Sequence, residues 1–160
     1  MRRRKYTLER SLDLRVAVLT TSVKTRKEPL KVIIDSNALF VPLQFKIDVV
    51  SELERLLNRR FELVMLSPVK RELEILAGKG TPKTRRMAGY ALKLAEKCRY
   101  VKVDDDSAEQ TVDDVIIKIA AKWKAPVFTN DAELRKRLRD ISVPVIYLRQ
   151  KSRLEIDGLI

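Results

Sequence analysis

Carboxylates are the side chains of this sequence whose type and spacing could do chemistry. The chain has no His and a single Cys, Cys98, which excludes imidazole catalysis and metal sites built on imidazole or several thiolates. Four acids stand where strands are expected to end or helices to begin: Asp35, Glu72, Asp113 and Asp131. Clustered carboxylates need a cation, and oxygen ligands alone select Mg2+ or Mn2+. One or two such ions support phosphodiester cleavage, so the acids predict a metal-dependent nuclease.

The elements that must position these acids alternate between short apolar runs and helical patterns. We expect strands at 31–34, 61–66, 99–103, 125–129 and 144–148, the last at the edge of the sheet. We expect helices at 68–77, with Ser67 as N-cap, and at 82–97, 113–123 and 131–139, and one whose apolar face runs from Phe45 to Leu57. This alternation predicts an α/β fold, a three-layer α/β/α arrangement with a mostly parallel central sheet.

The strand ends explain why acids distant in sequence could meet. Parallel strands point their carboxyl ends to one side of the sheet. Asp35 directly follows the first strand, and Asp131 follows the fourth. Glu72 lies one turn into the helix after the second strand, and Asp113 heads the helix before the fourth. We therefore expect all four carboxylates in one cleft.

Two of the acids have neighbours that could take their place. Glu72 lies beside the buried face marked by Val69, Leu73 and Leu76, whereas Glu74 points further away. In "TVDD", Thr111 as N-cap and Asp114 at the third helical position fit a capping box, which gives Asp114 a structural role and leaves Asp113 for the site.

Capping is also the alternative interpretation of the remaining acids. Asp35 could cap a helix or form a turn, and Asn130 or Asp131 could start the last helix. "IIDSN" nevertheless places three polar side chains at a strand end where one would suffice, which favours function. The run Asp104 to Asp106 is interpreted as a solvated loop and not as the metal site.

Length and charge predict one domain with a polyanionic partner. We divide the 160 residues into a basic N-terminal extension at 1–30, a nuclease domain at 31–150 and a C-terminal tail at 151–160. The net charge of +12 favours nucleic acid, because Lys and Arg contacts to phosphate release counterions; solubility is the alternative. No apolar run approaches the ~20 residues of a membrane span and no leader pattern is present, so we expect a cytoplasmic protein without a membrane partner.

Four motifs in order resemble the PIN-domain ribonucleases. They are "IIDSNALF", "SPVKRELE", "TVDDVIIKIA" and "VFTNDAEL". The third acid of that family precedes an Ala by seven residues and the last acid by eighteen, and Asp113 meets both spacings through Ala120 and Asp131. Within the family, "RELEILAG" and "TNDAELRKRLRDISVPVIYL" resemble the small-subunit-processome endonucleases that trim pre-ribosomal RNA.

The resemblance implies metal-dependent hydrolysis of single-stranded RNA, with a ribosomal precursor as substrate and a homodimer as a plausible assembly. The four acids would hold Mg2+ or Mn2+, with supporting roles for Ser36, Asn37, Asp114, Thr129 and Asn130. Basic residues that would position the RNA are Lys83, Arg85, Arg86, Arg135, Lys136, Arg137 and Arg139. Two alternatives remain open: a toxin-type ribonuclease of a toxin-antitoxin pair, and a non-catalytic RNA-binding or assembly module. A phosphoryl-accepting receiver domain is disfavoured, because no phosphate-pairing Lys follows a late strand.

Overall fold

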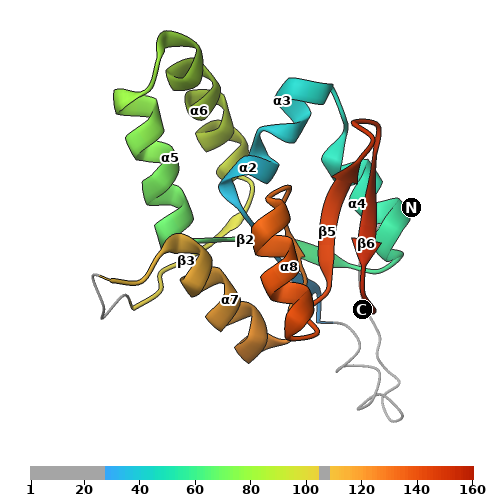
Figure 1. The fold of residues 1–160 in the computed structure, drawn as a ribbon. Helices are drawn as coiled ribbons and strands as arrows, with labels where there is room; N and C mark the ends of the chain where they lie inside the picture. The colour runs from blue at the N-terminus through green and yellow to red at the C-terminus, as the bar shows by residue number, and fades with distance from the viewer. Residues whose placement is uncertain (1–27, 105–108) are drawn as a thin grey trace, which may run out of the picture.

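A six-stranded sheet organises the computed structural model, which describes residues 28–104 and 109–160 (Figure 1). The strands are β1 (Leu30–Ile34), β2 (Phe61–Leu66), β3 (Arg99–Val101), β4 (Val127–Phe128), β5 (Val145–Arg149) and β6 (Arg153–Asp157), in the order β3-β2-β1-β4-β5-β6. Every pairing is parallel except that of β5 with β6. The predicted fold class is therefore confirmed. Most of the predicted basic extension, up to residue 27, lies outside the described residues.

Helices cover both faces of this sheet. They are α2 (Ser36–Leu39), α3 (Val41–Phe45), α4 (Val49–Leu57), α5 (Ser67–Lys79), α6 (Pro82–Ala95), α7 (Val112–Trp123) and α8 (Ala132–Asp140). Connections between parallel strands are right-handed, so those that lead from β1 to β3 lie on one face and those that lead from β3 to β5 lie on the other. Figure 1 shows α7 and α8 in front of the sheet, and α5 and α6 packed side by side as a projecting hairpin. Among the described helices, none is both long and apolar enough to cross a membrane.

The core follows from the apolar runs of the sequence. Val32, Ile33 and Ile34 of β1 are all buried, as expected of a central parallel strand with helices on both faces. Ile116 of α7 and Leu134 of α8 are also fully buried, so each of these helices packs an apolar face against the core. The order reverses between β1 and β4: the chain moves from β1 toward β3 and then crosses to β4. Such a switch point is where α/β sheets open a crevice at the carboxyl ends of the strands.

Two predicted helix boundaries are wrong. The apolar face from Phe45 to Leu57 is not one helix, because Lys46 adopts a left-handed conformation with φ of 55° and ends α3. Asp48 then caps α4 by accepting a hydrogen bond from the Ser51 amide at 3.1 Å. Leu66, not Ser67, occupies the N-cap position of α5, and the Ser67 hydroxyl accepts a hydrogen bond from the Val103 amide at 3.0 Å.

The predicted edge position of the 144–148 strand is also wrong. β6 pairs with β5 along its length, and its residues lie in the segment predicted as a C-terminal tail. The backbone of Leu154 is held by α4: the Glu52 carboxylate accepts from its amide at 3.0 Å, and the Arg55 guanidinium donates to its carbonyl at 3.2 Å. Arg153–Asp157 is thus part of the sheet.

We expect Leu154→Ala to lower the free energy of unfolding by about 2 to 5 kcal/mol, because a fully buried side chain leaves a cavity when truncated. Urea denaturation followed by circular dichroism measures this loss. Leu159, which is 94% exposed, is the matched control, and Leu159→Ala should change stability by less than about 0.5 kcal/mol. Equal effects of the two substitutions would contradict the placement of β6 in the sheet.

Candidate active site

Asp35 is a buried carboxylate at the end of β1. Its backbone is extended and its amide still donates to the Phe128 carbonyl of β4, at 3.0 Å. One carboxylate oxygen, Oδ1, accepts from the Ser36 amide at 2.8 Å and so caps the short helix α2. The other, Oδ2, accepts from the Thr129 hydroxyl at 2.7 Å and from Asn37 Nδ2 at 3.2 Å. The predicted capping role is therefore real, but it occupies only one oxygen of a side chain that is 4% exposed.

The surroundings of Asp35 oppose its ionisation. Burial raises the pKa of this carboxyl from 3.8 to about 6, although the hydrogen bonds from Thr129 and Ser36 oppose the rise. The negative charges of Asp113 and Glu72 raise it further. Burial and two nearby negative charges disfavour the ionised form of Asp35, and a bound cation would stabilise it.

The end of β4 supplies the second part of the site. Thr129 is fully buried, and its hydroxyl, which donates to Asp35, also accepts from the Asp131 amide at 3.1 Å. Asn37 Oδ1 accepts from the Asn130 amide at 2.9 Å, so the segment after β1 is bound to the segment after β4. Asn130 Oδ1 accepts from the Leu148 amide of β5 at 2.9 Å. Residues predicted to support the acids thus connect three neighbouring strands.

Asp131 caps the helix that follows. Its Oδ1 accepts from the amides of Glu133 and Leu134 at 2.9 and 3.2 Å, while its Oδ2 makes no hydrogen bond with another described residue. Capping and ligation are therefore compatible in this side chain, because each uses a different oxygen.

Glu72 reaches the site from α5. The Ser36 hydroxyl donates to Glu72 Oε1 at 2.5 Å, although the two residues are 36 positions apart. Val69 and Leu73 are fully buried and Glu72 lies beside them, while Glu74 is exposed. The expected orientation of Glu72 toward the strand ends is what the helix shows.

Asp113 and Asp114 differ in the way that the capping-box spacing predicts. Asp114 Oδ2 accepts from the Thr111 amide at 3.2 Å, and its Oδ1 accepts from Arg137 at 2.8 Å. Asp113 makes no hydrogen bond with any other described residue, although its side chain is partly buried. Burial is the largest cause that raises the pKa of Asp113, and the negative charge of Asp131 raises it further. The positive charge of Arg137 lowers this pKa, while the charges of Glu72 and Asp114 make smaller contributions that raise it. Asp131 and Glu72 thus lie close enough for their charges to act on Asp113, and the charge of Asp113 in turn acts on Asp35.

The donor set fits a hard divalent cation. Asp35, Glu72, Asp113 and Asp131 come from four separate segments, and oxygen is the only ligand atom that they offer. The charges of Glu72 and Asp113 act on Asp35, and those of Asp131 and Glu72 act on Asp113. Within residues 28–104 and 109–160, no three acids converge closely enough to coordinate one ion as their side chains now stand. The contacts explain this, since both Asp35 oxygens, one Glu72 oxygen and one Asp131 oxygen are bound to protein donors.

The basic residues predicted to hold RNA divide into two groups. On α8, Arg135 and Arg139 both pair with Asp157, at 3.2 and 3.1 Å, and Arg137 pairs with Asp114, while Lys136 is exposed. Lys83, Arg85 and Arg86 are exposed in the first turns of α6, at the end of the α5 and α6 hairpin that projects from the sheet (Figure 1). Of these residues, Arg137 lies beside the acids, since its charge acts on Asp113 and its guanidinium donates to Asp114.

Two residues beside the site were missed by the sequence analysis. A pocket of about 260 Å³ opens between α5 and α7 next to Glu72, and its lining includes Arg71, Gln110 and the apolar Val112. The only signal for Arg71 was its position directly before Glu72. Gln110 precedes the capping box without any motif of its own.

Comparison with known proteins supports a single family. A family model described as "PIN like domain" matches residues 32–151. Ribonuclease VapC4 of Methanocaldococcus jannaschii is 36% identical over 131 residues, which cover 81% of this chain and 98% of that protein. Ribonuclease VapC9 of Archaeoglobus fulgidus is 32% identical over 127 residues, which cover 79% and 89%.

Solved structures agree on the fold. The PIN domain endonuclease Utp24 superposes with a TM-score of 0.67 and 28% identity, over 82% of this chain and 94% of that one. A domain of a functionally unknown protein from Methanocaldococcus jannaschii, with a TM-score of 0.56 and 17% identity, shares the fold. With a matching model over most of its length and two relatives above 30% identity, this chain belongs to the PIN-like domain family.

Proposed function

We propose that this protein is a metal-dependent endoribonuclease that hydrolyses phosphodiester bonds in single-stranded RNA. The observation that carries the proposal is the placement of four acids near the carboxyl ends of the central strands β1 and β4. Asp113 keeps both oxygens without a hydrogen bond to another described residue, and its charge acts on the buried Asp35. Two relatives named ribonuclease and the net charge of +12 support RNA as the substrate.

The chain's own residues would prepare this site for the reaction. Asp35, Glu72, Asp113 and Asp131 would hold Mg2+ or Mn2+, which when bound supplies Lewis acidity and a water of lowered pKa. The Thr129 hydroxyl fixes the rotamer of Asp35, and the Ser36 hydroxyl holds Glu72 toward it. Arg137 donates to Asp114, so that carboxylate is already paired. Asp113 would then be the acid in the first turn of α7 that binds the metal.

Ribosomal RNA processing is the role that we propose first. The motifs resembling the small-subunit-processome group and the 28% identity to the endonuclease Utp24 support it. A cytoplasmic location and a homodimer stay predictions that accompany this proposal.

The second candidate is a toxin-type ribonuclease of a toxin-antitoxin pair, and the two archaeal relatives named ribonuclease VapC favour it. Growth arrest on expression of the intact chain, absent with Asp35→Asn, together with a neighbouring small antitoxin reading frame, would select the toxin. Normal growth combined with accumulation of pre-ribosomal RNA on depletion would select processing. RNA binding without turnover at any metal concentration would instead indicate the non-catalytic module.

Substituting an acid of the cluster should abolish cleavage. We expect Asp35→Asn or Asp113→Asn to lower the rate on single-stranded RNA with Mn2+ by more than about 100-fold, since loss of a supporting partner alone costs roughly 10- to 100-fold. Thr129→Val should fall within that smaller range. Gel electrophoresis of labelled RNA measures the rates. Asp104→Asn is the matched control in an exposed acid, and cleavage equal to that of wild type in the Asp113 variant would contradict the proposed site.

The raised pKa of Asp35 predicts a pH-dependent stability. Between the ordinary pKa of 3.8 and the folded value of about 6, the folded state holds a proton on Asp35 that the unfolded chain releases. The contribution of Asp35 to the free energy of unfolding therefore falls as the pH rises through this range. Asp35→Asn should therefore stabilise the metal-free protein by about 1 to 3 kcal/mol at pH 8 and leave it almost unchanged near pH 4.

Thermal unfolding in EDTA across that pH range measures the difference between wild type and Asp35→Asn. Addition of Mn2+ should raise the melting temperature of the wild type and not that of the variant. A variant less stable than wild type at every pH would show that the hydrogen bonds to Asp35 outweigh its burial.

A further inference from the structure

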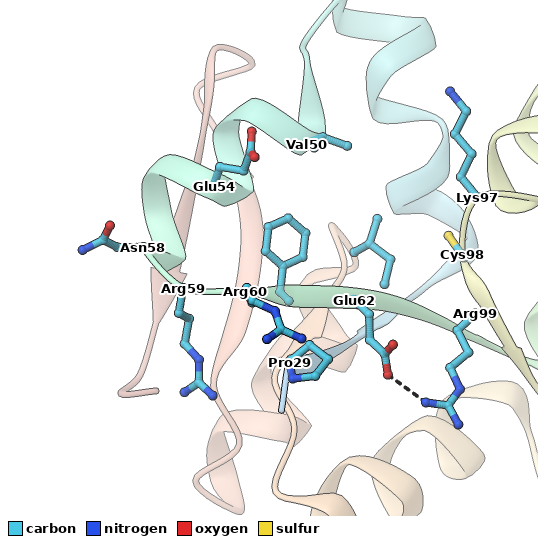
Figure 2. Close-up of a pocket in the computed structure, with 12 residues that line it drawn as sticks. Pro29, Val50, Glu54, Asn58, Arg59, Arg60, Glu62, Lys97, Cys98 and Arg99 are labelled. Atoms are coloured by element: carbon cyan, nitrogen blue, oxygen red, sulfur yellow. Dashed lines mark hydrogen bonds and ion pairs between the residues drawn. The ribbon is translucent and has the colours of Figure 1, made fainter. Parts of the chain in front are cut away.

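A second concave surface lies at the opposite end of the sheet from the acids. It is a groove of about 1100 Å³ between the last turn of α4, the start of β2 and the end of α6 (Figure 2). Its lining includes Asn58, Arg59, Arg60, Phe61, Lys97 and Arg99. We refer to it as the basic groove.

Most of the positive charge of the basic groove has no counter-charge. The side chains of Arg59, Arg60 and Lys97 are exposed and make no hydrogen bond or ion pair with another described residue. Arg99 donates to Glu62 at 3.0 Å, the pair that Figure 2 marks with a dashed line. With Glu54 as the other acid in the lining, the groove keeps an excess of positive charge.

The arginines of α8 provide a contrast. Arg135, Arg137 and Arg139 face Asp157 and Asp114, so contact with phosphate would have to compete with ion pairs inside the protein. Arg59 and Arg60 have no such competitor. Phe61 adds a partly buried ring to the lining, and basic grooves that contain aromatic side chains are typical of single-strand binding.

We propose that the basic groove binds the backbone of single-stranded RNA at a distance from the cleavage site. This inference rests on the proposed function only for the choice of RNA as the polyanion. β2 connects the two regions, because Phe61 begins it at the groove and α5, which carries Glu72, follows its end. Six strand residues span roughly 20 Å, so RNA must be long enough to cover that distance before it engages both surfaces.

Binding can be measured without cleavage. In the full chain carrying Asp35→Asn, fluorescence anisotropy with a labelled single-stranded RNA is recorded against salt concentration, with and without Arg59→Ala and Arg60→Ala together. Both side chains are exposed and unpaired, so the fold should be retained. We expect affinity to fall roughly tenfold at low salt and the slope of log affinity against log salt to become less negative by about 1.4, since each phosphate contact to a single strand contributes about 0.7.

The matched control is Lys118→Ala with Lys122→Ala, which removes the same charge from exposed positions of α7 on the other face of the sheet. It should leave affinity and slope nearly unchanged. Equal losses in the two double variants would show an effect of net charge alone and overturn the proposal.

An unchanged affinity in the groove variant would also overturn it and assign the groove to a partner other than RNA. Absence of cleavage in the wild type would contradict the ribonuclease proposal without altering these results.

Discussion

Burial of the Asp35 carboxylate at the end of β1 is the constraint to which the surrounding structure is adapted. A buried charge is costly unless donors or a cation compensate it. The Ser36 amide, Asn37 and the Thr129 hydroxyl supply the donors, and Thr129 is itself positioned by pairing between β4 and β5. Ser36 and Asn37 then extend to Glu72 and to the Asn130 amide. Hydrogen bonds of Asp35, Ser36 and Asn37 thus connect the end of β1 to the end of β4 and to α5. This role explains why a polar triplet stands between two apolar runs.

Most of the fold could be predicted because the apolar periodicities are strong, and the failures have identifiable causes. β6 was missed because it follows a tight turn at Gln150 and Lys151, with φ of 52° and 58°, where the usual signal is Asn or Gly. Lys46 ends α3 in the same left-handed region without a residue type that announces it. β6 is also bound by contacts from a distant segment, since Glu52 and Arg55 of α4 hydrogen-bond to the backbone of Leu154, and such contacts cannot be seen in the local sequence.

The candidate site was predictable to the extent that it depends on local rules. The capping box separated Asp113 from Asp114, and helical spacing separated Glu72 from Glu74, because both are properties of single helices. The roles of the arginines were not predictable, because their partners are distant in sequence. Asp157 engages Arg135 and Arg139 from a strand that the sequence analysis missed, and the uncompensated arginines follow α4 in a loop that no motif marks.

We propose that the four acids form one divalent-metal site at the carboxyl ends of β1 and β4. A crystal structure of the protein soaked in Mn2+, with anomalous scattering to locate the ion, tests this site most directly. We expect an anomalous peak bound by oxygens of Asp113 and at least one of Asp35, Glu72 and Asp131, with Asp114 still paired to Arg137. A peak held by Asp114, or Mn2+ found only at other acids such as Asp104, would contradict it.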